Sequence, residues 1–320
     1  MTLWNAPPEL IARWRKRFGA RGLRVVAAPH DVPFERGLED AEILVGHGLT
    51  VDLFRRATKL EWIQAPSAGV GHLLFPELVA SPVILTNARG VHADPMAEHV
   101  IGMMLALVRK IHRARDFQDR GEWAQDLLWR EEPLLDEIGG RTLGIVGLGA
   151  IGKALAWRAH ALSMRVIGLR RHDDGELPTG VTEARGADEL AWLLGQSDFV
   201  ANCLPSTPAT KGLIGREAFG LMKPGAYLFN VGRGNTVDEA AMIAALESGR
   251  LAGAGLDVTA EEPSPASSPL YRLPQVLLTF HIAGASRRFW DRAAELFEDN
   301  VERYLDRRPL RNVVNKKEGY

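Results

Sequence analysis

The stretch RTLGIVGLGAIGKALAWRAHALSMRVIGLRRH, residues 141–172, indicates which fold a large part of the chain adopts. It begins with an apolar run at 143–146 that is typical of a buried strand. The glycine-bearing run 147–152 follows at once, and residues 153–162 have helical composition and spacing. A second strand is predicted at 165–169. A strand, G-x-G-x-x-G, a helix and a strand form the context in which this glycine pattern indicates dinucleotide binding.

Each glycine of this run meets a separate need of a pyrophosphate site. Gly147 permits the tight turn out of the strand, Gly149 lets the anion approach the backbone, and Gly152 lets the helix pack against the sheet. The N–H groups of the first helical turn and the positive end of the helix dipole then face the phosphates. The residues predicted to contact the cofactor here are Gly147, Leu148, Gly149, Ala150, Ile151 and Gly152.

The end of the second strand bears on which dinucleotide is bound. An NAD site usually has an acidic residue here that accepts a hydrogen bond from the ribose 2′-hydroxyl. This chain has Arg170 and Arg171 instead, and two guanidinium groups can grip a 2′-phosphate. We therefore predict a preference for NADP(H), with NAD(H) as the alternative cofactor. The competing interpretation is an exposed basic turn in which Asp173 or Asp174 takes the ribose.

Composition excludes several classes of function. The chain has 320 residues, enough for two domains, of which 46% are hydrophobic and 25% charged, as in ordinary globular proteins. A net charge of −1 gives no electrostatic basis for binding nucleic acid or an anionic membrane. The single cysteine, Cys203, excludes an intramolecular disulfide, and the nine histidines show no metal-ligand spacing. We predict a cytoplasmic protein without signal peptide, membrane span or metal.

Alternating strand and helix signals predict an α/β fold with two Rossmann-like domains, doubly wound parallel sheets and a cleft between them. Expected elements are strands at 23–28, 41–45, 60–64 and 83–86, one long helix at 95–117, and six strands from residue 143 onward. The predicted division is a flavodoxin-like substrate domain of residues 1–97 and 284–320 and a dinucleotide-binding Rossmann domain of residues 98–283.

Polar side chains follow three of the later predicted strands. Arg233 follows one of them. Asp257 follows the next, with Glu262 just beyond, and His281 follows the last. In open α/β sheets, ligands bind outside the carboxyl ends of the strands. We therefore expect these side chains to converge on the nicotinamide end of the cofactor, although each taken singly also suits a surface ion pair, a solvated turn or a satisfied polar group.

With these motifs the chain resembles the D-specific 2-hydroxyacid dehydrogenase family over nearly its whole length. The motifs are SAGV at 67–70, AEHV at 97–100, GLGAIG at 147–152, NVGRG at 230–234, LDV…EEP at 256–263 and TFHIAG at 279–284. The resemblance implies that Arg233, Glu262 and His281 are catalytic and that the chain is a homodimer joined through its cofactor domains. It also implies cofactor contacts at Leu204, Pro205, Thr210, Val231, Gly232, Asp257, His281 and Ala283, and we expect Asp257 to orient the nicotinamide ring.

The chemistry of a 2-keto acid suits these residues. Arg233 can hold the substrate carboxylate and polarise the carbonyl as hydride arrives. His281 can supply the proton that the developing alkoxide needs, and Glu262 can stabilise and orient the imidazolium. Backbone N–H groups of the loop Ser67, Ala68, Gly69 and Val70 can bind the carboxylate as an anion nest. The predicted reaction is NADP(H)-dependent reduction of glyoxylate, hydroxypyruvate or a larger 2-keto acid to a 2-hydroxy acid.

Departures from the family pattern leave alternatives open. Phe280 stands before His281 where relatives commonly have proline, which predicts a reshaped pocket wall. A cofactor-sensing binding protein similar to the C-terminal-binding-protein corepressors, or a phosphite dehydrogenase, fits the same scaffold; formate dehydrogenases carry Gln in place of the catalytic Glu. Trp123 and Trp129 fit either a subunit contact or packing on their own domain. Glu98 and His99, early in a helix, are expected to serve the helix dipole and the domain junction.

Overall fold

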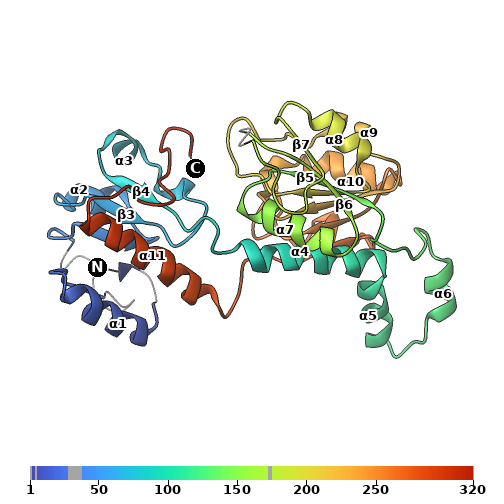
Figure 1. The fold of residues 1–320 in the computed structure, drawn as a ribbon. Helices are drawn as coiled ribbons and strands as arrows, with labels where there is room; N and C mark the ends of the chain where they lie inside the picture. The colour runs from blue at the N-terminus through green and yellow to red at the C-terminus, as the bar shows by residue number, and fades with distance from the viewer. Residues whose placement is uncertain (1, 4–5, 28–37, 172–174, 320) are drawn as a thin grey trace. The chain divides into compact units, whose positions relative to one another are not determined.

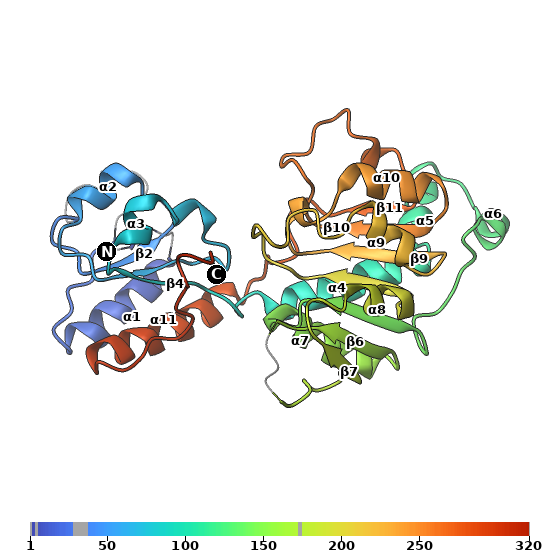
Figure 2. The same ribbon diagram turned by 90° about the horizontal axis from the view of Figure 1, so that it is seen from above.

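The computed structural model describes residues 2–3, 6–27, 38–171 and 175–319. Contacts between residues divide the chain into two compact units, each with its own parallel sheet (Figures 1 and 2). Unit 1 is built from Met1–Val91 and Ser286–Tyr320, and unit 2 from His92–Ala285. The expected first boundary, after residue 97, would cut through helix α4 (Ala93–Val108), which belongs as a whole to unit 2.

Unit 1 contains a four-stranded sheet in the order β1-β2-β3-β4, with every neighbouring pair parallel. Its strands are β1 (Thr2–Leu3), β2 (Ile43–Gly46), β3 (Trp62–Gln64) and β4 (Ile84–Thr86). Its helices are α1 (Pro8–Gly19), α2 (Val51–Arg56), η1 (Gly71–Leu73), α3 (Pro76–Ala80) and α11 (Phe289–Leu305). Strand β3 is buried along its whole length, as is usual when helices cover a parallel sheet.

Helices α1 and α11, which come from opposite ends of the chain, lie side by side in unit 1 (Figure 1). Trp14 on α1 and Trp62 on β3 both contact the ring of Phe297 on α11, at centroid distances of 4.7 and 5.9 Å. Aromatic contacts of this kind contribute about 0.5–1.5 kcal/mol each beyond the area that they bury. The carboxylate of Glu298 accepts a hydrogen bond from the Trp14 indole at 2.8 Å and pairs with Arg13. The first and last helices therefore share one core.

One strand of unit 1 differs from the prediction. Residues 23–27 of the expected strand 23–28 form only a single β-bridge, at Ala27, and residue 28 lies outside the described residues. The N–H of Leu23 instead bonds to the carbonyl of Phe18 at the end of α1, and the carbonyl of Val25 accepts from the Arg15 side chain. The sheet begins with β1, whose two residues are too few to give a periodic signal.

Unit 2 contains a seven-stranded parallel sheet in the order β11-β10-β9-β8-β5-β6-β7. Its strands are β5 (Thr142–Val146), β6 (Arg165–Leu169), β7 (Glu183–Arg185), β8 (Phe199–Asn202), β9 (Ala226–Asn230), β10 (Leu251–Leu256) and β11 (Val276–Leu278). Besides α4, its helices are α5 (Ile111–Asp119), α6 (Gln125–Arg130), α7 (Ala150–Ala161), α8 (Leu190–Gln196), α9 (Arg216–Leu221), η2 (Gly234–Thr236), α10 (Glu239–Glu247) and η3 (Pro269–Tyr271). The prediction of six strands missed β7, because Glu-Ala-Arg at a sheet edge carries no apolar signal.

Helices cover both faces of this sheet (Figure 1). On one face, Met104 of α4 and Leu155 of α7 pack in a core with Ile145 of β5. On the other, Leu193 of α8 packs in a second core with Val146, the next residue of β5. Neighbouring strand residues thus point to opposite faces, and both faces are buried. The predicted α/β class with parallel sheets is confirmed.

The expected long helix at 95–117 is two helices. Helix α4 ends at Val108, and the break before α5 falls at Lys110, whose φ of 52° lies in the left-handed region. The Lys110 side chain is buried, and its ammonium donates hydrogen bonds to the carbonyl oxygens of Leu128 and Glu131 at the end of α6. These bonds fix the turn and tie α6 back to the helix break, a long-range contact that helical periodicity alone cannot reveal.

Helices α5 and α6 and the chain that follows them, residues 111–137, are called the arm below; they extend away from the sheet of unit 2 in Figure 1, and α6 is the outermost part of the unit in both views (Figures 1 and 2). The arm exposes large apolar side chains: Trp123 is 91% exposed and Trp129 is 60% exposed. At this exposure neither ring is packed into the core of its own unit. No helix within the described parts of the chain is long and apolar enough to cross a membrane.

Candidate active site

The glycine fingerprint lies between β5 and α7, at the point where the strand order of the sheet reverses. Gly147 has a φ of 105°, and a Cβ there would meet the backbone of Cys203. A Cβ at Gly152 would lie 2.3 Å from the carbonyl oxygen of Gly147, so the helix packs on the turn only with glycine. A Cβ at Gly149 would meet nothing within 4 Å, and among the described residues no acceptor binds the N–H groups of residues 149–151. Open space and free donors at a helix N-terminus fit a dinucleotide pyrophosphate.

The carboxyl end of β6 carries the two arginines predicted to choose the cofactor. Nη1 of Arg170 donates a hydrogen bond to the carbonyl of Glu176 at 2.9 Å, and Arg171 also has interaction partners. The alternative ribose acceptors, Asp173 and Asp174, lie outside the described residues. The preference for NADP(H) over NAD(H) therefore stays a prediction from the basic sequence at this strand end.

A network of buried side chains holds the loops after β8 and β9 together. The side-chain amide of Asn202 donates to Oδ1 of Asn230 at 3.0 Å and to Oγ1 of Thr236 at 2.7 Å. The hydroxyl of Thr236 in turn donates to the backbone carbonyl of Arg233 at 2.6 Å. All three network side chains are at most 1% exposed, and a buried network with its partners satisfied fixes the conformation around it. The backbone that carries Arg233 is therefore held rigidly.

The Arg233 loop packs directly on the loop that carries Glu262. A Cβ at Gly234 would lie 1.7 Å from the carbonyl oxygen of Thr259, an overlap with backbone that no side-chain rotation relieves. Oε1 of Glu262 accepts a hydrogen bond from the N–H of Thr259 at 3.2 Å. Nη1 of Arg233 donates to the carbonyl of Gly232 at 2.7 Å. Two predicted catalytic residues, distant in sequence, thus stand on adjoining loops.

Two of the predicted catalytic side chains are in contact. Nδ1 of His281 lies 2.6 Å from Oε2 of Glu262. Both side chains are partly exposed, at 53% and 37%, so a ligand can reach them. A carboxylate bound at Nδ1 orients the ring and leaves the Nε2 proton of the imidazolium as the one that can be transferred. This pair can act as an oriented proton donor and acceptor.

Asp257 is buried beneath the loop that carries His281. Its side chain, 1% exposed, accepts hydrogen bonds from the Thr279 hydroxyl at 2.8 Å and from the N–H groups of Ile282 and Ala283 at 2.9 and 3.1 Å. Its backbone carbonyl accepts from the N–H of His281 at 2.6 Å. The carboxylate is therefore engaged by the protein itself, and its expected role in orienting the nicotinamide stays a prediction.

Phe280, the departure noted before His281, has a φ of 53°. A proline ring fixes φ near −65°, so proline does not fit this backbone. The Phe280 ring is 68% exposed and stacks with Tyr271 at a centroid distance of 6.4 Å. Phe280 thus places an exposed apolar ring beside His281 on a backbone that proline does not suit.

The remaining predicted cofactor contacts lie on loops near the fingerprint. Leu204 packs over Gly147, where a Cβ would come within 3.2 Å of its side chain. The hydroxyl of Thr210 donates to the carbonyl of Pro205 at 2.7 Å and closes the loop between them. The buried positions of this set are Val231, Gly232 and Ala283. Contact of each residue with the cofactor stays a prediction.

In unit 1, the predicted substrate loop runs from Ser67 to Val70 after β3. Oγ of Ser67 donates to the carbonyl of Gly69 at 2.7 Å, and the carbonyl of Ala68 accepts from the Asn87 amide at 2.8 Å. Among the described residues, no acceptor binds the three N–H groups from Ala68 to Val70. Successive unpaired N–H groups suit an anion, so the loop fits the predicted role, which stays a prediction.

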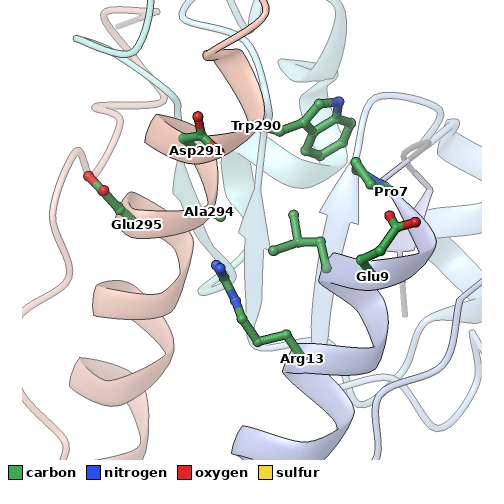
Figure 3. A pocket seen from close by; sticks show the side chains of 8 residues that line it. Pro7, Glu9, Arg13, Trp290, Asp291, Ala294 and Glu295 are labelled. Atoms are coloured by element: carbon green, nitrogen blue, oxygen red, sulfur yellow. The ribbon is translucent and has the colours of Figure 1, made fainter.

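A separate hollow of about 500 Å³ lies in unit 1 between α1 and α11 (Figure 3). It is lined by Pro7, Glu9, Leu10, Arg13, Trp290, Asp291, Ala294 and Glu295. None of the predicted site residues lines it. Within the described ranges, no group of three or more His, Cys, Asp or Glu side chains is placed to hold a metal ion.

Some residues that support the site were not predicted as such. His99, assigned from sequence to the helix dipole and domain junction, has Nε2 2.8 Å from Oγ1 of Thr279, directly beside the His281 loop. Glu98 pairs instead with Arg158 of α7 at 3.2 Å. The buried asparagines after β8 and β9 did leave a signal, since each is a polar residue at the end of an otherwise apolar strand.

Comparison with known proteins gives consistent matches over most of the chain. Residues 101–283 match the family model of the D-isomer specific 2-hydroxyacid dehydrogenase NAD binding domain. A glyoxylate/hydroxypyruvate reductase B from Yersinia enterocolitica is 33% identical over 316 residues, which are 97% of this chain and 95% of that protein. A D-3-phosphoglycerate dehydrogenase from Methanocaldococcus jannaschii is 34% identical over 284 residues, which are 87% of this chain but only 52% of that protein.

A solved structure agrees with both units of the fold. The NADPH-dependent glyoxylate/hydroxypyruvate reductase from Sinorhizobium meliloti, in complex with NADP and sulfate, has a TM-score of 0.79 at 29% identity, and the match covers 100% of this chain and 98% of that one. The recognised family and the predicted enzyme class are therefore confirmed. The chain belongs to the D-isomer specific 2-hydroxyacid dehydrogenase family and is a nicotinamide-dependent oxidoreductase.

Proposed function

We propose that the enzyme reduces 2-keto acids to D-2-hydroxy acids with NADPH as its preferred hydride donor, and that glyoxylate and hydroxypyruvate are among its substrates. The observation that carries the chemistry is the 2.6 Å contact between His281 and Glu262 on loops of the fingerprint-bearing unit. The names of the Yersinia and Sinorhizobium relatives support the substrate class. Of the alternatives, phosphite oxidation has no specific observation in its favour.

Reduction of a 2-keto acid adds a hydride to the carbonyl carbon and a proton to the carbonyl oxygen. A dinucleotide bound at the fingerprint would supply the hydride from its nicotinamide ring. His281, as the imidazolium, gives its Nε2 proton to the oxygen as negative charge develops there, while Glu262 holds Nδ1 and stabilises the charged ring. Arg233 binds the substrate carboxylate through charge-assisted hydrogen bonds and draws electron density from the carbonyl. In oxidation the same imidazole accepts the proton.

The unpaired N–H groups of the loop from Ser67 to Val70 are proposed as further donors to the substrate carboxylate. Lengthening this loop by one residue should raise KM for every 2-keto acid, and an unchanged KM would remove the loop from the site.

The preference for NADPH rests on the two arginines at the end of β6 and on the NADP-bound Sinorhizobium relative. The ratio of kcat/KM for NADPH to that for NADH tests it. In the double variant Arg170→Ala and Arg171→Ala this ratio should fall about 10-fold or more, because charge-assisted hydrogen bonds contribute about 1.5–3 kcal/mol. Arg115→Ala, which removes an arginine on α5 paired with Asp119, is the matched control and should leave the ratio unchanged. A wild-type preference for NADH would overturn the proposal.

We further propose that the enzyme is a homodimer joined through unit 2, with the exposed apolar side chains of the arm in the interface. Trp123→Ser should shift the molar mass from light scattering toward the monomer. Trp157→Ser, which replaces a tryptophan 53% exposed on α7, is the matched control. A monomeric wild-type enzyme would contradict the proposal. A cytoplasmic location stays a prediction, supported by the single cysteine of the chain.

The decisive experiment follows NADPH oxidation against a panel of 2-keto acids that includes glyoxylate, hydroxypyruvate and pyruvate, with larger aliphatic and aromatic members. Reduction of at least one member to the D-hydroxy acid is the expected outcome. Reduction of NADP⁺ by phosphite, with no turnover of the panel, would establish the alternative. Formation of the L-hydroxy acid would reject the proposed stereochemistry.

A further inference from the structure

The structure assigns a positioning role to two residues outside the proposed catalytic set. We propose that His99 and Thr279, acting through the buried carboxylate of Asp257, hold the loop that presents His281 to the substrate. The proposal rests on the proposed function only for the role of His281. The arrangement of the loop itself can be measured without any turnover.

The hydrogen bonds between these residues run in one direction. Nε2 of His99 lies 2.8 Å from Oγ1 of Thr279, and that hydroxyl lies 2.8 Å from Oδ1 of Asp257. An ionised carboxylate has no proton to give, so the single hydroxyl proton of Thr279 goes to Asp257. Oγ1 is then an acceptor, and Nε2 of His99 must carry a proton and donate it. Each residue in the series therefore fixes the orientation of the next.

The loop at the end of this series has a backbone that needs support. Phe280 and His281 have φ values of 53° and 60°, in the left-handed region that residues with a Cβ rarely adopt, and they do so consecutively. Asp257 is the residue that holds them there, because its backbone carbonyl binds the N–H of His281 and its carboxylate binds the N–H groups of Ile282 and Ala283. A carboxylate that rotates would release the loop on the far side of His281.

Helix α4 is what makes the arrangement rigid. His99 lies on this helix, whose inner face is buried in the core of unit 2, so its imidazole starts from a fixed backbone. The side chain is 21% exposed, which places it at the border of the core rather than in solvent. Loss of the His99 donor removes one of the two hydrogen bonds that orient the Thr279 hydroxyl and leaves only its bond to Asp257. The consequence is a less well-defined position for the imidazole of His281.

Strand β11, which Thr279 follows, offers a matched control at its other end. His112, on α5, has Nε2 3.0 Å from the carbonyl of Pro274, which precedes β11, and Nδ1 2.9 Å from the carbonyl of Ala106. Thr279 follows β11 at its carboxyl end. Each histidine thus ties a helix to one end of β11, but only His99 lies at the end that leads into His281. A purely structural role predicts similar effects for both.

The experiment compares His99→Leu and Thr279→Val with the conservative variants His99→Gln and Thr279→Ser and with the control His112→Leu. Because small displacements of a catalytic group lower rates by up to about 100-fold, we expect kcat in the first two variants to fall by about 10- to 100-fold with KM for NADPH unchanged. The Gln amide and the Ser hydroxyl can restore the bonds, so these variants should recover most of kcat. His112→Leu should keep kcat even if its Tm falls as far as that of His99→Leu.

Hydrogen exchange gives a readout that does not depend on turnover. The amides of Ile282 and Ala283 should exchange faster in His99→Leu than in the wild type and in His112→Leu. Equal exchange in all three proteins, or a folded His99→Leu enzyme with wild-type kcat, would overturn the proposal. A wild-type protein inactive on every 2-keto acid would reject the proposed function but leave the exchange test of the loop intact.

Discussion

The loops after the strands are built differently in the two units. In unit 2 the loops after β8, β9 and β11 are closed by buried polar side chains: Asn202 bonds to its neighbours across two loops, and Asp257 binds the loop of His281, whereas the turn after β5 keeps the N–H groups of residues 149–151 without acceptors in the described parts of the chain. In unit 1 the loop from Ser67 to Val70 leaves successive N–H groups without acceptors among the described residues. A proton donor works only from a defined position, whereas an anion site needs donors that the protein has not already used. The bonded loops of unit 2 suit a fixed proton donor, and the unpaired loop of unit 1 suits an anion.

The largest expected effect is the fall in kcat when the proposed proton donor, His281 of unit 2, is removed. His281→Ala should lower kcat by about 10²- to 10⁴-fold, the usual contribution of general acid–base catalysis, while the affinity for NADPH stays near that of the wild type. Single-turnover NADPH oxidation and fluorescence titration measure the two quantities. If the variant keeps full kcat, the proton comes from another group, and the contrast between the two units loses its chemical meaning.

The next largest expected effect is a difference in thermal stability between substitutions in the loops of unit 2 and beside the loop of unit 1. Gly234→Ala places a Cβ 1.7 Å from a backbone oxygen, and overpacking of this kind costs about 1–3 kcal/mol or more, so Tm should fall by several degrees. Gly71→Ala, after the unit 1 loop, meets nothing within 4 Å and is the matched control. Thermal unfolding of both variants checks the comparison. A similar Tm for the two would show that the loops of unit 2 are no more tightly packed than that of unit 1.

The smallest expected effect is a pH dependence in unit 1. The pKa values of His47 and His72 both lie below the ordinary value of 6.5, because burial disfavours the charged ring; for His47 repulsion from His72 adds to this effect. The unfolded chain then binds protons more readily than the folded one. The stability contribution is complete above pH 6.5 and is lost as the pH falls through the lowered folded pKa values.

Replacement of one imidazole tests this linkage. As the pH is lowered from neutral to about 5, within the range in which histidine titrates, the Tm of His47→Gln should fall less than the Tm of the wild type. The two rings lie 5.6 Å apart between centroids, and the pKa of the remaining His72 should stay below its ordinary value because burial lowers it. Identical pH profiles for the two proteins would mean that these imidazoles are as well solvated in the fold as in the unfolded chain.

Much of unit 2 could be predicted because its constraints are local. Gly147 and Gly152 each answer a separate steric need within a single turn, and Gly149 leaves open space for a phosphate, so their spacing identifies the turn before any tertiary contact is known. Arg233, Glu262 and His281 were predicted to lie together because parallel strands bring their carboxyl ends to one edge, and their catalytic roles stay a prediction. Sequence order was therefore enough to place these residues on neighbouring loops.

The unpredicted features depend on contacts between distant residues. The helix break at Lys110 is stabilised by carbonyl groups at the end of α6, which periodicity does not register. The edge strand β7 contributes a single small apolar residue, Ala184, to the core, which is too little for a periodic signal. His99 gains its role from Thr279, 180 positions further along the chain, and nothing in the motif AEHV points to that partner. Contacts between residues so far apart in the sequence are set by the folded structure, and local sequence patterns do not reveal them.

The shared core of α1 and α11 has a consequence for biosynthesis. Phe297 and Glu298 complete a core whose other large residues, Trp14 and Trp62, leave the ribosome far earlier. Domains usually fold in the order in which they are translated, but here the N-terminal unit cannot close until its C-terminal helix emerges. The nascent chain must therefore keep residues 1–91 of unit 1 unfinished while all of unit 2 has already been translated.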